Sequence, residues 1–253
     1  MNNPIFLIST GRTGTNFFSR LFSEHCENVA SYHTTRFTRF LNVLGNMHYF
    51  NLISEKRLRL IWKQFKYREI NRHSRQYIEN NPYYYSYLNI INDLFPEAKF
   101  IWITRFPKSF IISHIQWEQQ RLQSRIANSL IPFWQPVSYL EQLKSILNYY
   151  QRVEYYSKVW ARKNIFILSS LGESPNFRRI KFEDVFNPNI GLSTIMNLMS
   201  WLELPATKPI TSEVLERKLN KSRNAGNFWD EKCENLMKHY CKTMMGTLGY
   251  SGV

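Results

Sequence analysis

Two glycines, an arginine and several hydroxyl side chains stand together directly after the first apolar run of the chain. The run Ile5–Ile8 leads into the stretch STGRTGTN, residues 9–16. Glycine lets a backbone approach an anion closely, and arginine and threonine side chains add charge and hydrogen-bond donors. An apolar-periodic stretch, residues 13–25, follows. The pattern predicts a strand, a tight turn and a helix whose N-terminus faces an anion.

The spacing of these glycines does not match the ATP-binding loop G-x-x-x-x-G-K-[ST]. Counting from Gly11, the second glycine would fall at Asn16, and no lysine follows it. A nucleotide kinase with a degenerate loop therefore stays a minor alternative. The anion is expected to be a different phosphorylated ligand.

A second group of chemically useful residues follows another apolar run. Lys99–Thr104 predicts a strand, and Arg105 stands at its exit. Pro107 is well placed to open a helix, and Ser113 comes eight residues after the arginine, about two helical turns along. We expect Arg105 and Ser113 to reach the same ligand.

These residues need strands and helices to hold them. Further strands are predicted at 164–168 and 178–182, and helices at 35–48, 54–68, 137–160, 190–203 and 230–246. Leu140, Leu143, Leu147 and Tyr150 form a stripe that is predicted to face the core. The alternation predicts an α/β protein of three layers, a central parallel sheet with helices on both faces. Ligands of such sheets bind beyond the carboxyl ends of the strands, so the Gly11–Gly14 turn and Arg105 should meet there.

Length and composition set the frame for these predictions. The 253 residues favour a single domain over 1–253, and 43% hydrophobic residues are typical of a globular protein. A net charge of +14 favours anionic partners. The three cysteines have no metal-ligand spacing, and the sequence shows neither a signal peptide nor a run long enough to span a membrane. We expect a cytoplasmic protein without a bound metal. The oligomeric state is left open.

Taken together, the two groups of residues resemble the 3′-phosphoadenylyl sulfate (PAPS)-dependent sulfotransferase family. GRTGTNFF, residues 11–18, is similar to the family's 5′-phosphosulfate loop, and RFPKSFIIS, residues 105–113, to its 3′-phosphate motif. FPEAKFIWITR, IKFEDVFNPN and the C-terminal KSRNAGNFW with TMMGTLGY are weaker similarities in the family's order. The resemblance covers most of the chain and is nearest to the bacterial and carbohydrate- or tyrosine-directed branch.

The resemblance implies a sulfotransferase fold with a P-loop-like turn, PAPS as the sulfuryl donor and a role for each motif residue. Arg105 and Ser113 would bind the 3′-phosphate, and Lys221 and Arg223 would close over it. Phe17 takes the position of an aromatic residue that stacks on adenine, although a place in the core is an equal alternative. The 5′-phosphosulfate would be held by Gly11, Arg12, Thr13, Gly14, Thr15 and Asn16.

Sulfuryl transfer also needs a base and a cation near the leaving phosphate. Arg12 is expected to supply the charge. His33 stands at the exit of an expected strand, in a segment where related branches carry the base, and is one candidate. Glu79, in a stretch resembling the family's E-k-x-P-x-Y, is the other. His48 and His114 are weaker candidates, and His114 is expected to face away from the ligand.

The acceptor is not determined by these patterns. A hydroxyl or amine of a small molecule or carbohydrate is the expectation, with aromatic-rich stretches or the basic residues at 56–75 near it. The alternative function is nucleic-acid binding, motivated by the charge and the aromatic residues. No recognised nucleic-acid module is visible, so a nucleic-acid partner is not expected.

Overall fold

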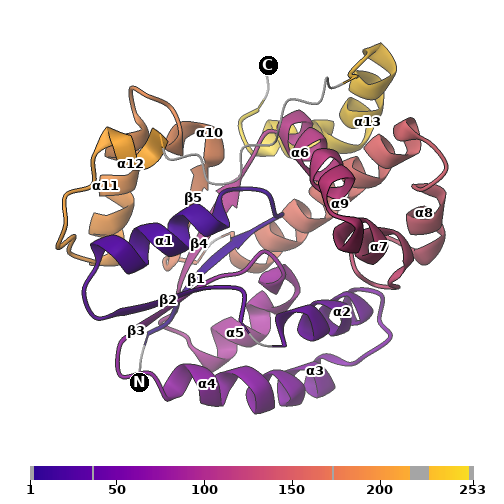
Figure 1. Ribbon diagram of the computed structural model, residues 1–253. Helices are drawn as coiled ribbons and strands as arrows, with labels where there is room; N and C mark the ends of the chain where they lie inside the picture. The colour runs from indigo at the N-terminus through magenta and orange to yellow at the C-terminus, as the bar shows by residue number, and fades with distance from the viewer. Residues whose placement is uncertain (1–2, 36, 173, 217–227, 251–253) are drawn as a thin grey trace.

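The core of the protein is a five-stranded parallel sheet (Figure 1). The computed structural model describes residues 3–35, 37–172, 174–216 and 228–250. The strands are β1 (Ile5–Ser9), β2 (Val29–His33), β3 (Gln76–Asn80), β4 (Lys99–Thr104) and β5 (Phe177–Lys181), in the order β2-β3-β1-β4-β5. All neighbouring pairs are parallel. β1 is therefore central, and its carboxyl end lies between those of β3 and β4.

Helices cover both faces of this sheet. One face packs against α1 (Thr15–His25), α10 (Phe182–Val185), α11 (Gly191–Leu202) and α12 (Ser212–Glu216). The other packs against α2 (Thr38–Tyr49), α3 (Glu55–Trp62), α4 (Arg68–Asn71), α5 (Leu88–Leu94), α6 (Pro107–Gln120), α9 (Tyr149–Leu171) and α13 (Glu231–Thr247). A π-helical turn, η1 (Lys63–Tyr67), joins α3 to α4, and a 3₁₀ turn, η2 (Tyr84–Tyr87), precedes α5. α7 (Leu122–Leu130) and α8 (Tyr139–Lys144) lie at the periphery (Figure 1). The predicted three-layer α/β architecture is confirmed.

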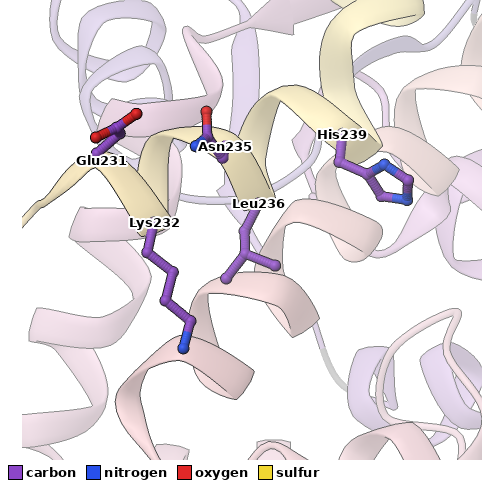
Figure 2. Close-up of a pocket in the computed structure, with 5 residues that line it drawn as sticks. All are labelled: Glu231, Lys232, Asn235, Leu236 and His239. Atoms are coloured by element: carbon purple, nitrogen blue, oxygen red, sulfur yellow. The ribbon is translucent and has the colours of Figure 1, made fainter.

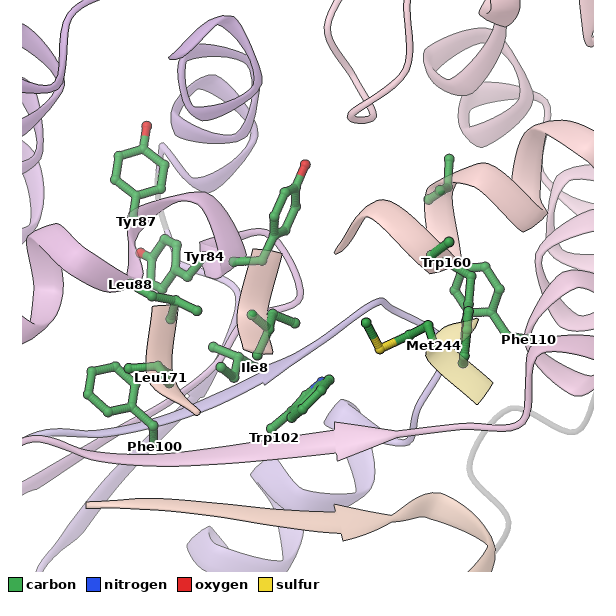
Figure 3. Packing of buried hydrophobic residues seen from close by; sticks show 14 of the residues in the cluster. Ile8, Tyr84, Tyr87, Leu88, Phe100, Trp102, Phe110, Trp160, Leu171 and Met244 are labelled. Atoms are coloured by element: carbon green, nitrogen blue, oxygen red, sulfur yellow. The ribbon is translucent and has the colours of Figure 1, made fainter. Parts of the chain in front are cut away.

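Alternation along the strands builds the two cores. On β1, Ile5 and Leu7 enter one cluster, whereas Phe6 and Ile8 enter the other. Successive side chains of a strand point to opposite faces, so a strand buried on both sides is apolar throughout. Figure 3 shows the larger cluster, where Ile8, Phe100 and Trp102 of the sheet lie below Trp160 of α9 and Met244 of α13. These packed faces fix the strand ends that carry the site.

Three sequence predictions about the elements were wrong, and one strand was not predicted. Residues 164–168, predicted as a strand, lie within the 23-residue helix α9, because a short apolar run fits a buried helix as well as a strand. The predicted helix 137–160 is two helices, separated after Lys144 and resumed at Tyr149 with Asn148 as N-cap. Leu140 and Leu147 of the predicted core stripe are 62% and 73% exposed. β3 was not predicted, since its sequence QYIEN contains polar residues that turn out to be buried.

No helix within the described part of the chain is both long and apolar enough to cross a membrane.

Candidate active site

The loop between β1 and α1 has the left-handed backbone that its glycines permit. Gly11 has φ +98° and Gly14 has φ +78°, whereas Arg12 adopts φ +56° despite its side chain. A non-glycine residue in this region is strained, and such strain is found at functional sites. α1 then begins at Thr15 without a side-chain N-cap. Its first N–H groups lack partners within the helix, and the helix dipole adds positive potential there.

The two predicted motifs meet at this loop. Arg105 leaves β4 and its Nη1 donates to the carbonyl oxygen of Arg12. Ser113 lies on α6, and its Oγ accepts from Nε of Arg12 at 3.2 Å. The carboxyl ends of adjacent parallel strands β1 and β4 share one edge, which is why residues about 100 positions apart in sequence touch. These contacts place Arg105 beside the glycine turn, as expected, and a shared ligand site stays a prediction.

Several buried hydrogen-bonding groups around the loop have no protein partner in the described structure. They are the hydroxyls of Thr10 and Thr13 and Nε of Arg105. Thr10 and Thr13 are essentially inaccessible to solvent. Because buried polar groups are normally paired, these donors fit an anion that accepts from all of them. The side chains therefore suit the phosphosulfate and phosphate groups of the expected donor.

The cations of the site are crowded together. Burial, followed by repulsion from Arg105 and Arg121, lowers the pKa of Arg12 to about 10. The ring of Trp117 on α6 contacts two guanidinium groups, with Arg12 at 4.3 Å and Arg121 at 4.1 Å from its centre. The guanidinium of Arg105 lies 4.4 Å from the ring of Phe182. Such stacking orients guanidinium planes, and a bound anion would relieve the repulsion between them.

The remaining predicted donor residues have different surroundings. Asn16 is half-buried in the first turn of α1. Phe17 is 5% exposed and packs edge-to-face on Phe18 and Phe186, which favours its core alternative over adenine stacking. Lys221 and Arg223 lie outside the described residues.

His33 ends β2 and contacts the loop directly. Its Nε2 lies 3.0 Å from the Thr15 hydroxyl, and its backbone is in register with Asn80 of β3. The side chain is half-buried, and burial lowers its pKa below the ordinary value, partly opposed by the charge of Glu79. His33 is therefore neutral at pH 7 and can accept a proton.

Glu79 is fully buried, which differs from the surface carboxylate that its sequence context also allows. Its Oε2 lies 3.0 Å from Nζ of Lys66 and accepts from Tyr77 at 2.7 Å. Its Oε1 accepts from Asn81 at 2.9 Å and Thr35 at 3.0 Å. These donors outweigh burial and hold its pKa below the ordinary value. Glu79 is thus an ionised carboxylate whose two oxygens are both occupied.

Two residues lie at the loop in a way that the sequence did not predict. His114 of α6 is 8% exposed, and its Nε2 lies 3.4 Å from the point where a Cβ on Gly11 would stand, so it does not face away as predicted. Lys163 of α9 is 1% exposed, and its Nζ donates to the Thr10 carbonyl at 3.4 Å. The position of His114 directly after Ser113 led to the expectation that it faces elsewhere, and Lys163 lies between the predicted helix 137–160 and the predicted strand 164–168.

A surface hollow of about 450 Å³ lies elsewhere, beside α13 (Figure 2). Its lining side chains all come from that one helix, Glu231, Lys232, Asn235, Leu236 and His239. None of the predicted site residues lines it. Within the described ranges, no group of three histidine, cysteine or acidic side chains is placed to hold a metal ion.

A parallel sheet whose central strand opens into a left-handed glycine loop beside an arginine of the next strand defines an α/β protein, and ligands of such sheets bind at the carboxyl ends of the strands. The model described as "Sulfotransferase family" matches residues 4–208, and the chain belongs to this family. The match spans the glycine loop, both candidate bases, Arg105 and Ser113.

Solved structures show the same fold. The sulfotransferase domain from the curacin biosynthetic pathway has 15% sequence identity and a TM-score of 0.57, over 98% of each chain. A sulfotransferase from Alicyclobacillus acidocaldarius has 13% identity and a TM-score of 0.54, over 98% of this chain and 96% of that one. No curated protein matches the sequence.

Proposed function

We propose that this sulfotransferase uses PAPS as its donor and transfers the sulfuryl group to a hydroxyl or amine of a small-molecule or carbohydrate acceptor. The observation that carries the proposal is the contact of Arg105 and Ser113 with Arg12 at the glycine loop. An adenosine that carries phosphate groups on both its 5′ and its 3′ oxygen could contact both motifs at once, the glycine loop through the 5′ group and Arg105 with Ser113 through the 3′ group. The 3′-phosphate distinguishes this donor from ATP, and arginine with a hydroxyl suits its recognition.

The glycine loop is the proposed binding site of the 5′-phosphosulfate. The hydroxyls of Thr10 and Thr13 have no protein partner, and α1 begins directly after the loop without a side-chain N-cap. Arg12 would stabilise the charge that develops on the phosphate as the bond to sulfur breaks. Arg12 is already paired with Ser113, so its side chain is held near the reacting group before the donor arrives.

We propose His33 as the general base. In the reaction, the acceptor oxygen or nitrogen attacks sulfur in line while the bond from sulfur to the bridging phosphate oxygen breaks. The proton of the acceptor passes to the imidazole of His33, and adenosine 3′,5′-bisphosphate leaves. His33 is half-buried, and its Nε2 is hydrogen-bonded to the hydroxyl of Thr15, the residue that follows the glycine loop.

Glu79 is proposed to position this side of the site. Its oxygens are engaged by four donors, so accepting a further proton would break an existing contact. The negative charge of Glu79 favours the protonated form of His33 and so partly offsets the lowering of its pKa by burial. A carboxylate fixed in this way orients its neighbours without leaving its network.

The basic segment 56–75 is better explained by packing than by nucleic-acid binding. Lys66 is buried and pairs with Glu79. Leu58 and Trp62 of α3 are fully buried in the larger core, whereas Lys56, Arg57 and Lys63 are exposed. Such a helix is amphipathic, with its charged face in solvent. Family membership and the donor geometry together support sulfuryl transfer over the nucleic-acid and kinase alternatives.

Calorimetric titration with adenosine 3′,5′-bisphosphate, with ADP and a short DNA strand in parallel, tests the proposal. The bisphosphate is expected to bind at least tenfold more tightly than ADP, and Arg105→Ala to remove that preference, about 1.4 kcal/mol or more. Arg20→Ala, which removes an exposed arginine of α1, is the matched control. Equal affinity for the bisphosphate and ADP would contradict the proposed donor. Transfer of ³⁵S from labelled PAPS to a panel of sugars and phenols would then define the acceptor.

A further inference from the structure

Lys163 is a buried cation without a counter-ion. Its side chain is 1% exposed, and among the described residues no carboxylate lies within ion-pair distance of it. Its one hydrogen bond goes to the Thr10 carbonyl at 3.4 Å. Burial lowers its pKa from the ordinary value of 10.5 to about 7. A buried ammonium without an acidic partner is costly, and such groups occur where an anion binds.

α9 directs this amino group at the start of the glycine loop. Trp160 and Lys163, three residues apart on one face of the helix, contact the ends of two adjacent strands. The indole Nε1 of Trp160 donates to the Arg105 carbonyl at 2.9 Å, and Lys163 donates to that of Thr10. The rings of Tyr83 and Tyr85 flank the amino group, with centres at 5.9 and 4.8 Å. The amino group is therefore held at the loop by packing.

His114 adds unused hydrogen-bonding capacity at the same place. Neither ring nitrogen has a partner, and the ring stacks on Tyr156 at 4.7 Å. Its Nε2 lies beside Gly11, where a side chain on that residue would contact it. Burial, then the charges of Arg12 and Lys163, hold its pKa well below the ordinary value. His114 is thus a neutral donor or acceptor that faces the loop.

The groups around this pair are mostly positive. Arg12 from the loop, Arg105 from β4 and Arg152 from α9 all act on His114. The nearby carboxylate of Glu118 is engaged by Arg152 and by the Tyr156 hydroxyl, so it leaves Lys163 uncompensated. Tyr83 and Tyr85 stay neutral, because burial raises the pKa of both phenols.

We propose that Lys163 and His114 bind the anionic group at the 5′ end of the donor, from the side of the glycine loop that faces α6 and α9, and that Lys163 takes up a proton when this group binds. The proposal rests on the proposed function. An anion at the loop supplies the missing counter-charge, so the protonated amine becomes the stable form and the proton comes from the buffer. Neutral His114 would donate a hydrogen bond to the same group.

A binding cycle separates this role from that of Arg105. Adenosine 3′,5′-bisphosphate and adenosine 3′-phosphate are each titrated against the wild type and Lys163→Met. A charge-assisted hydrogen bond corresponds to about 10- to 100-fold in affinity. The wild type is therefore expected to prefer the bisphosphate, and Lys163→Met to reduce that preference about tenfold or more while its affinity for the 3′-phosphate is unchanged. His114→Phe, which keeps the stack on Tyr156, should reduce it several-fold.

Proton linkage gives a second readout. Calorimetry of the bisphosphate at pH 8 in buffers of different ionisation enthalpy should show proton uptake by the wild type. Lys163→Met should show less uptake than the wild type, whereas Lys158→Met should match the wild type. Lys158 is a matched control on the same helix, because it is paired with Glu141 and Glu154 away from the loop.

Stability distinguishes a ligand-binding lysine from a structural one. Lys163→Met is expected to raise the melting temperature of the free protein at pH 7 while weakening bisphosphate binding. Lys163→Arg, which keeps a charge, should retain part of the 5′ preference. A wild type that prefers the bisphosphate over ADP and loses this preference in Arg105→Ala supports the proposed function. If Lys163→Met then keeps the full preference for the bisphosphate over adenosine 3′-phosphate, this inference alone is overturned. A wild type with no preference over ADP would overturn the proposed function.

Discussion

The two sides of the central strand β1 handle their polar groups in opposite ways. On the side of β4 and α6, the hydroxyls of Thr10 and Thr13 and Nε of Arg105 have no partner, and Arg12 and Arg105 repel each other. On the side of β2 and β3, Glu79 accepts from four donors, and Lys66 contacts four acceptors. The polar groups of both sides are buried, so the two sides differ in whether the protein itself supplies their hydrogen-bonding partners.

This difference indicates which side is complete without a ligand. An unpaired buried donor costs free energy until an acceptor arrives, so the β4 side gains stability when an anion binds. The buried Lys66–Glu79 pair is satisfied within the protein and gives the β2–β3 side a fixed geometry. Substitutions on the first side should therefore weaken function more than folding, and substitutions in the second network should weaken folding.

His33 ends β2 and contacts Thr15 at the start of α1, so it connects the β2–β3 side with the glycine loop. Its loss is expected to have the largest effect on turnover. Removing a general base lowers turnover by about 10²–10⁴-fold. Because the pKa of His33 is lowered, the acidic limb of the wild-type kcat/KM profile should fall below pH 6.5 and be absent in His33→Ala. Steady-state rates between pH 5 and 9 measure this. If Glu79→Gln, and not His33→Ala, removes the limb, the base is Glu79.

Lys66→Met should lower the stability of the protein by disrupting the Lys66–Glu79 network on the β2–β3 side. It leaves Glu79 charged and buried without its cation, which costs about 3–5 kcal/mol of unfolding free energy. Urea denaturation measures the loss, with the exposed neighbour Lys63→Met as control. The double variant Lys66→Met with Glu79→Leu should recover part of it. A loss below 1 kcal/mol in the single variant would show that the network does not hold this side together.

Arg12→Ala, on the β4 side, should lower activity without lowering stability. Removing a cation at the developing charge lowers kcat by about 10²–10³-fold. Folding should be unharmed or improved, because burial and Arg105 already oppose the charge of Arg12. Activity and melting temperature are measured together, with exposed Arg20→Ala on α1 as control. If Arg12→Ala keeps its activity but loses stability, Arg12 serves folding rather than function, contrary to the expectation for the β4 side.

Gly14→Ala is expected to have the smallest effect, on the loop itself. The added Cβ would lie 3.3 Å from the Phe186 ring at a residue with φ +78°, so a loss of about 1–2 kcal/mol is expected. Gly246→Ala is the matched control, since its Cβ meets nothing within 4 Å inside α13 and should add about 0.5–1 kcal/mol. Thermal unfolding compares the two, and equal shifts would exclude a strained loop.

Local sequence predicted the loop side well. Ile5–Ile8 and Lys99–Thr104 match β1 and β4 closely, and Pro107 opens α6 as expected. These elements are specified by nearby residues, apolar alternation, glycines that permit positive φ and a proline that fits the first helical turn. The sequence also placed Arg105 beside the glycine loop, because parallel strands share one functional edge.

The β2–β3 side was predicted less well because its signals are not local. Glu79 and Lys66 are charged residues whose burial depends on each other, and neither alone marks a buried strand or helix face. The strand wrongly placed at 164–168 has the same origin, since an apolar run of that length fits either element until its neighbours are known.

The sequence by itself therefore determined the parallel α/β class, the glycine loop and the position of Arg105 at the exit of the adjacent strand, since each is a pattern of adjacent residues with a direct steric or electrostatic consequence. Only the tertiary structure decided that His114 faces Gly11, that Glu79 is enclosed with Lys66 and that Lys163 is buried without a counter-ion. Their environments are set by contacts across 13 to 153 positions of the chain. Burial and pairing arise from such long-range packing, and they determine the charge state of each group.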